Sequence, residues 1–187
     1  MRQSCIEQSF QLRTGGLFLF LLYFLGPSGI YGQATQQITF KNWTQQDGLP
    51  NNSVNAVTRD PRGFLWLGTN NGLCRYDGPG VLKVYRNSAS PDAAQSQSNG
   101  LRANFIRSLI CDHEGNLWIG TRFGGLTRFN PAQNTWKTFM HNPNQDNSIS
   151  NNEVLTILED SRHRIWAGTE DGLNLFDPAT SSFIRFT

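Results

Sequence analysis

The side chains that could bind a metal ion or act as a nucleophile are few, and they follow no recognised pattern in the sequence. His113, His141 and His163 have no metal-ligand spacing, either among themselves or with Cys74 and Cys111. Because His113 and His163 fall in predicted turns, solvated turn residues are the simpler interpretation. The sequence therefore predicts no metal site and no cofactor.

Three aspartates recur at equivalent positions, namely Asp60, Asp112 and Asp160. Glycoside cleavage would need two carboxylates at a specific separation. A repeating unit instead places one aspartate at the rim of each copy, where it accepts hydrogen bonds in a turn. We therefore expect these aspartates to be structural and the chain not to be an enzyme.

The aspartates belong to a pattern that occurs three times. The segments that align with one another are residues 55–77, 107–130 and 155–177. Their tryptophans recur at a period of about 50 residues, which is longer than known helical repeats and favours a unit of several short strands. Runs of apolar and β-branched residues between turn residues predict four strands per unit. In the first unit these strands are 54–59, 64–69, 73–76 and 81–85.

A tight hairpin turn is predicted between the first two strands of each unit. Residues 60–63 and 112–115 begin with an Asp that accepts backbone hydrogen bonds and end with a Gly that supplies a positive φ. The third unit has His163 in place of that Gly. We therefore expect its turn to be strained or of another type.

A four-stranded meander cannot bury both of its faces alone, and meanders packed face to face around an axis are the blades of a β-propeller. The predicted fold is therefore all-β, built of propeller blades. The indole of each unit should fill the gap between adjacent blades, and the glycine two residues later should leave room where backbones crowd. These structural residues are Trp66, Gly68, Trp118, Gly120, Trp166 and Gly168.

The predicted domain boundaries follow from the repeats. Residues 33–53 form a closing strand, predicted at 38–43, and its connection, and the three repeats occupy 54–103, 104–152 and 153–187. A closed propeller has at least about four blades. Three repeats thus predict an incomplete propeller, which is a piece of a longer chain or assembles with further blades or other copies of itself.

The N-terminal residues 1–32 are typical of a secretory signal peptide. Arg2 and Arg13 precede an apolar core at 17–25, and small residues follow it. A membrane-spanning helix needs about 20 apolar residues, so an uncleaved anchor is the alternative and the only membrane contact that we expect. The predicted location is periplasmic or secreted. The net charge of +2 gives no reason to expect a nucleic-acid partner.

The residues 47–54, 63–73 and 116–121 resemble the two-component regulator propeller repeats. This resemblance implies the periplasmic sensor region of a hybrid two-component system of the kind found in Bacteroidetes, many of which sense oligosaccharides. Kinase, receiver and DNA-binding modules of that family have no counterpart in this sequence. The resemblance thus implies a sensing, ligand-binding portion of a longer hybrid sensor. The alternative is a freestanding secreted propeller that acts as a protein- or glycan-binding scaffold.

Ligand contacts in propellers usually lie on one face, where the loops between second and third strands meet the connections between blades. The residues of these loops are Asn70, Asn71, Arg122, Phe123, Glu170 and Asp171. Arg122 and Phe123 pair a cation with an aromatic ring, which suits a sugar or an acidic group. The second loop is also one residue longer than the other two. We predict that these loops bind an oligosaccharide or a protein ligand, with ordinary loop variation as the alternative.

Overall fold

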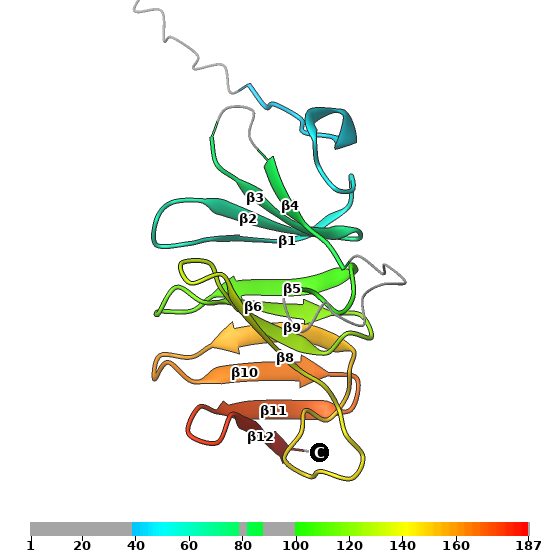
Figure 1. Ribbon diagram of the computed structural model, residues 1–187, viewed down its shortest axis with the longest axis vertical. Helices are drawn as coiled ribbons and strands as arrows, with labels where there is room; N and C mark the ends of the chain where they lie inside the picture. The colour runs from blue at the N-terminus through cyan, green and yellow to red at the C-terminus, as the bar shows by residue number, and fades with distance from the viewer. Residues whose placement is uncertain (1–38, 79–81, 88–99, 187) are drawn as a thin grey trace, which may run out of the picture. The chain divides into compact units, whose positions relative to one another are not determined.

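The computed structural model describes residues 39–78, 82–87 and 100–186 (Figure 1). The chain divides into two compact units, Met1–Phe40 and Lys41–Thr187, and only residues 39 and 40 of the first are described. The predicted signal peptide therefore lies outside the described residues. Within the described ranges, none of the helices is sufficiently long and apolar to cross a membrane.

Three four-stranded antiparallel sheets make up the second unit, and each takes its strands from one repeat in chain order. Blade 1 contains β1 (Val54–Arg59), β2 (Leu65–Thr69), β3 (Gly72–Tyr76) and β4 (Leu82–Tyr85). Blade 2 contains β5 (Ile106–Cys111), β6 (Leu117–Thr121), β7 (Leu126–Asn130) and β8 (Thr135–Phe139). Blade 3 contains β9 (Val154–Glu159), β10 (Ile165–Thr169), β11 (Gly172–Asp177) and β12 (Ser182–Phe186). The predicted all-β fold of four-stranded units is confirmed.

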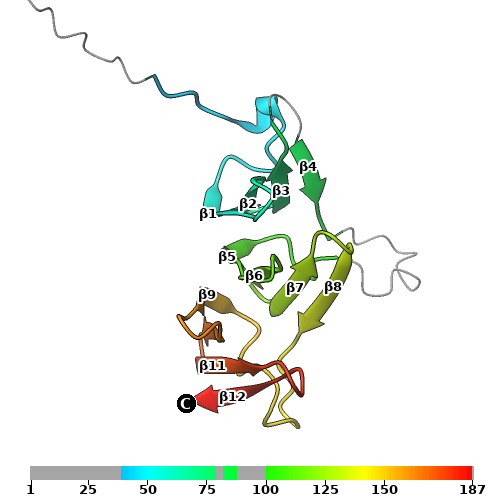
Figure 2. The same ribbon diagram turned by 90° about the vertical axis from the view of Figure 1, so that its left-hand side faces the viewer.

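The blades pack through their first strands. Strand β1 contacts β5, and β5 contacts β9, so these three strands lie next to one another in chain order (Figure 2). Each first strand carries a register shift near its start, as between Ile106 and Ser108 in β5. Because these first strands contact one another, residues at their two ends meet residues of the neighbouring blade.

The hairpin turns have the predicted geometry. Gly63 and Gly115 have φ values of 92° and 82°, and the third turn keeps the same left-handed conformation with His163 at 61°. A β-carbon in this region is sterically unfavourable. The expectation of strain at His163 is confirmed, and the turn type does not change.

The tryptophans fill the spaces between blades. Trp66 is fully buried, with its ring 5.7 Å from that of Phe129 in blade 2. Trp118 is equally buried and lies 4.9 Å from Phe176 in blade 3. Trp166 is only half-buried, because no further blade covers its face among the described residues. Burial of this indole therefore depends on a next blade.

Each hairpin aspartate also accepts a hydrogen bond from the indole of its own blade. The Nε1–H group donates to the Asp Oδ2 over 3.1 Å in Trp66–Asp60, 2.8 Å in Trp118–Asp112 and 2.9 Å in Trp166–Asp160. The turn was predicted, but this second role was not. The constant spacing of six residues between Asp and Trp was the signal. Asp60 and Asp112 are consequently buried, not exposed at the rim.

The glycine of each Trp-x-Gly motif makes room for side chains of the first strands. A β-carbon on Gly68 would lie 2.6 Å from Ile106 Cγ2, and one on Gly120 would lie 2.2 Å from Ser108 Oγ and 2.8 Å from Val154 Cγ1. Ile106 and Val154 belong to the next blade. The crowding therefore comes from side chains of neighbouring strands, whereas the sequence had suggested backbone.

The predicted closing strand at 38–43 is wrong for residues 39–43, which form no strand. Position 38 lies outside the described residues. The chain instead enters a short 3-10 helix, η1 (Gln45–Asp47), which is capped by Thr44, and Trp43 packs edge-on against Tyr76 at 5.0 Å. The physical reason is that each of the three sheets already contains its own fourth strand. No described sheet lacks the strand that this segment would supply.

Candidate functional site

The predicted ligand-binding residues lie in the loops β2–β3, β6–β7 and β10–β11, at corresponding ends of the three blades. These loops are tied to the connections between blades. Gly72 donates its N–H to Asn104 O over 2.7 Å, and Gly125 donates to Asn152 O over 2.9 Å. The β2–β3 and β6–β7 loops thus border the start of the next blade, as the sequence argument assumed.

Arg122 and Phe123 are both exposed on this face. The Arg122 guanidinium lies 4.9 Å from the centre of the Phe123 ring, and Phe123 is 65% exposed. Phe123 also has a φ of 71°, which only a constrained loop imposes on a residue with a side chain. The backbone of the longer loop therefore holds an aromatic ring out into solvent beside a cation.

Three further residues join this pair, and the sequence analysis missed them. Arg107 is ion-paired with Glu153 across the junction of blades 2 and 3, and Arg122 Nε lies 3.7 Å from the same Glu153 oxygen. Phe105 lies beneath both guanidinium groups, at 5.7 and 5.8 Å. These residues flank the first positions of β5 and β9, where the repeats differ from one another. These sequence differences at equivalent positions of the repeats were the available signal.

The corresponding loops of blades 1 and 3 are occupied by internal hydrogen bonds. Asn70 Oδ1 accepts from Asn55 Nδ2 over 2.7 Å, and the Asn71 carbonyl accepts from an arginine side chain. Asp171 Oδ2 accepts from Asn151 Nδ2 over 2.7 Å, and Glu170 is exposed. In the described ranges, no hydrogen bond or ion pair joins these loops to Arg122 or Phe123. The structure therefore brings together only the blade-2 part of the predicted site.

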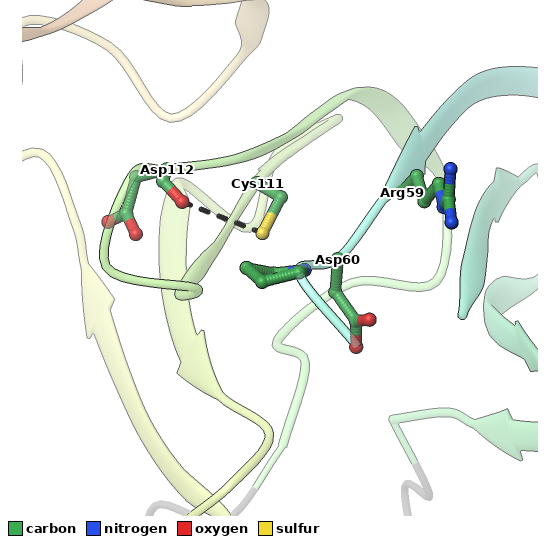
Figure 3. Close-up of a pocket in the computed structure, with 5 residues that line it drawn as sticks. Arg59, Asp60, Cys111 and Asp112 are labelled. Atoms are coloured by element: carbon green, nitrogen blue, oxygen red, sulfur yellow. Dashed lines mark hydrogen bonds between the residues drawn. The ribbon is translucent and has the colours of Figure 1, made fainter. Parts of the chain in front are cut away.

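A hollow of about 420 Å³ lies at the opposite ends of blades 1 and 2, lined by Arg59, Asp60, Pro61, Cys111 and Asp112 (Figure 3). Burial raises the pKa of the Cys111 thiol to about 11, so it is a poor nucleophile near neutral pH. Both carboxylates already accept hydrogen bonds from an indole and from turn N–H groups. These groups are engaged in holding the turns, and the hollow offers no free acid or base.

His113 and His163 come together at the junction of blades 2 and 3. Their rings stack at 4.0 Å, and their Nδ1 atoms lie 2.5 and 3.1 Å from the same oxygen, Glu159 Oε1. Burial raises the pKa of Glu159, but hydrogen bonds from both histidines outweigh it and hold the pKa below its usual value. These histidines, which have no metal-ligand spacing in the sequence, thus meet at one carboxylate in the fold. Linear spacing missed the group because the packing of blades assembles it.

Comparison with known proteins shows what this architecture belongs to. Residues 48–71, 100–123 and 148–171 match the family model described as two component regulator propeller. The chain carries three repeats of the two-component regulator propeller family. The matched segments run from the connection before each blade to the β2–β3, β6–β7 or β10–β11 loop. The resemblance inferred from the sequence is confirmed.

Relatives of this regulator propeller include sensor proteins. The extracellular domain of BT3049 from B. thetaiotaomicron, described as a hybrid two component system, is 25% identical with a TM-score of 0.72, covering 79% of this chain and 20% of that one. "Histidine kinase P4" of Formosa agariphila is 32% identical over 116 residues, covering 59% of this chain. The chain spans only 8% of that kinase's length. The likeness to the BT3049 domain shows that this chain has the same type of fold.

An enzyme shares this fold as well. A catalytically inactive variant of virginiamycin B lyase from Staphylococcus aureus, solved with quinupristin, has a TM-score of 0.51 at 17% identity, covering 74% of this chain and 43% of that one. At this identity the likeness concerns the fold alone. The blade architecture by itself thus does not decide between sensing and catalysis.

Proposed function

We propose that this chain is the extracytoplasmic sensing portion of a two-component signalling system and that it belongs to a longer hybrid sensor. The observation that carries the proposal is the match of all three blades to the regulator propeller model, together with their likeness to the BT3049 extracellular domain. Sensing places the chain outside the cytoplasm, in agreement with the export that residues 1–32 predict. Sequencing the N-terminus of the protein recovered from the periplasm tests this location. Recovery from the cytoplasm alone would contradict it.

The ligand that suits the blade-2 loop is an oligosaccharide. An exposed aromatic ring such as Phe123 stacks on the apolar face of a sugar, and guanidinium groups donate hydrogen bonds to hydroxyl or carboxylate oxygens. Arg107 and Arg122 supply these donors, and Glu153 holds both of them in place. The cation beside the ring favours an acidic sugar over a neutral one.

Calorimetric titration of the full chain with neutral and acidic oligosaccharides tests this assignment. Phe123→Gly removes the ring while suiting the positive φ, so the loop should keep its conformation. We expect Phe123→Gly and Arg122→Ala to abolish binding and Lys137→Ala, on β8, to leave it unchanged. Unchanged affinity in both loop variants would exclude this surface. Binding of a protein partner but of no saccharide would favour the scaffold alternative.

We further propose that the chain binds its ligand without transforming it. The carboxylates in the hollow of Figure 3 are already engaged in the turns, and the Glu153 carboxylate beside the blade-2 loop is paired with two arginines. Chromatography and mass spectrometry of oligosaccharides after prolonged incubation with the chain should show no product. Product formation by the wild-type chain that disappears in Phe123→Gly would refute this view.

The outer face of blade 3 points to a partner that continues the propeller. Leu158, Trp166 and Ile184 lie in one cross-strand row of this face, and Leu158 and Ile184 are 60% and 53% exposed. The same face carries fully buried tryptophans in blades 1 and 2. We propose that further blades or another copy of the chain cover it. Light scattering should show self-association of the isolated chain that Ile184→Lys weakens, and a monomer at all concentrations would contradict cover by other copies.

A further inference from the structure

A cluster of two histidines and one glutamate lies at the opposite ends of the blades from the Arg122–Phe123 loop. We propose that His113, Glu159 and His163 bind a divalent transition metal, with Zn²⁺ as the ion that fits best, and that this ion fastens blade 2 to blade 3. His113 comes from the β5–β6 turn of blade 2. Glu159 ends β9, and His163 lies in the β9–β10 turn of blade 3.

The donor atoms are already gathered. One nitrogen of each imidazole and one carboxylate oxygen all lie within 4.8 Å of one another. Tetrahedral zinc with bonds near 2.1 Å separates its ligand atoms by roughly 3.4 Å. The distance from His163 Nδ1 to Glu159 Oε1 is 3.1 Å, so it needs to change little, and the shorter His113 contact of 2.5 Å needs to open by about 1 Å.

The backbone holds these ligands in place without the ion. The His113 N–H donates to both Glu159 oxygens, at 3.0 and 3.3 Å, which fixes the carboxylate against the blade-2 turn. His163 is fixed by the turn bond from its N–H to Asp160 O at 2.8 Å. Preorganised ligands favour metal binding because little conformational freedom is lost. Two anchored turns thus present the three ligands at one point.

The ligand set and its exposure indicate the kind of ion. Two imidazoles with one carboxylate suit Zn²⁺ and related transition metals, whereas Ca²⁺ and Mg²⁺ prefer oxygen ligands throughout. The side chains of His113 and His163 are 44% and 60% exposed, whereas that of Glu159 is 17% exposed. An ion can therefore enter from solvent, and water can complete its coordination.

The cluster is particular to this junction and does not follow from the repeat. At the junction of blades 1 and 2, the equivalent positions are Pro61, Cys111 and Gly115. There, a β-carbon on Gly115 would lie 3.6 Å from the Pro61 ring, so the same two turns approach each other with no ligand atoms from imidazole or carboxylate. The fold brings the turns together at both junctions, and only the second one carries metal-binding side chains.

Calorimetric titration of the untagged full chain with ZnCl₂ tests the site. We expect one Zn²⁺ per chain and an increase in the thermal unfolding temperature on binding. Co²⁺ should give the visible absorption of a tetrahedral complex. Absence of saturable Zn²⁺ binding would overturn the proposal and leave a hydrogen-bonded His–Glu–His group only.

Two variants separate loss of the site from loss of the fold. His163→Gly places at this turn the residue that blades 1 and 2 use, so the chain should fold at least as well while Zn²⁺ affinity falls tenfold or more. Glu159→Gln keeps the side-chain shape and should weaken binding similarly. His141→Gln is the control, because His141 lies on a different connection and bonds Ile149 O. Equal Zn²⁺ affinity in all three variants would place the ion elsewhere and refute the assignment.

Discussion

Replacement of Asp60 by alanine should be among the most destabilising single changes in this protein. Asp60 is buried, and its carboxylate accepts from Trp66 Nε1 at 3.1 Å and from the N–H groups of Arg62 and Phe64 at 3.0 and 3.1 Å. Asp60→Ala leaves the fully buried indole N–H with no acceptor, which costs about 1–3 kcal/mol. The two lost turn hydrogen bonds add about 1 kcal/mol each. We expect a loss of about 3–5 kcal/mol, a large part of the stability of a typical domain.

Blade 3 provides the matched control. Asp160 accepts from Trp166 Nε1 and from the N–H groups of Arg162 and Arg164 in the same pattern, but both the carboxylate and the indole are partly exposed. Water can replace the lost acceptor there, so Asp160→Ala should destabilise clearly less than Asp60→Ala. Urea unfolding followed by tryptophan fluorescence measures the free energy of unfolding of both variants, and the two values can be compared if the m-values agree.

The comparison of the two variants decides whether burial of the indole sets the cost. A loss in Asp160→Ala as large as in Asp60→Ala would show that the turn hydrogen bonds, which the blades share, carry the effect. A second check is the double variant Asp60→Ala with Trp66→Phe, in which no unpaired N–H remains. It should be less destabilised than the sum of its single variants.

Three other predictions follow from single contacts. Burial raises the pKa of Asp60, but hydrogen bonds from the indole and a turn N–H outweigh it, so the folded-state pKa is lowered. The stabilisation by the Asp60 carboxylate is therefore present above the unfolded-state pKa of about 3.9 and is lost as pH falls through the folded-state pKa. In an acid titration, the difference in free energy of unfolding between the wild type and Asp60→Asn should shrink below about pH 4. Gly120→Ala should cost about 1–3 kcal/mol in urea unfolding, because its β-carbon would lie 2.2 Å from Ser108 Oγ, whereas Gly100→Ala, with nothing within 4 Å, should be neutral. Cys111, with a pKa of about 11, should react slowly with iodoacetamide at pH 8 until urea is added, and rapid native labelling would contradict the raised pKa.

The fold could be predicted because its causes are local and recur. Strand alternation, the hairpin turn and the Trp-x-Gly motif occur in every unit, so each copy supports the interpretation of the other two. The strain at His163 was also predictable, since it replaces a glycine whose positive φ the other turns require. Features that depend on one short stretch and its neighbours are readable from sequence.

The segment before blade 1 shows the limit of this approach. Its residues resemble a fourth strand, and a strand forms only where a sheet edge accepts it. That edge is a property of other parts of the chain. Because β4, β8 and β12 already complete the three described sheets, the same residues continue into η1 instead, and Trp43 packs on Tyr76.

The sequence predicted only part of the blade-2 site and missed the histidine–carboxylate group, and both failures have the same cause. Arg107 pairs with Glu153, and the His113 N–H bonds Glu159, and both pairs are separated by 46 residues. The equal separation arises because β5 and β9, which belong to different sheets, pack against each other, so a contact at one end of these strands fixes the partners at the other end. Neither pair is conspicuous in a linear reading, where 46 residues is an arbitrary distance. The repeat spacing between blades 2 and 3 is 48 residues, from Trp118 to Trp166, so it does not by itself give this separation. Once one such contact is known, however, adjacent first strands can be aligned two residues short of the repeat spacing, and that alignment contains both the ion pair beside the β6–β7 loop and the histidine–carboxylate group at the opposite ends of the blades.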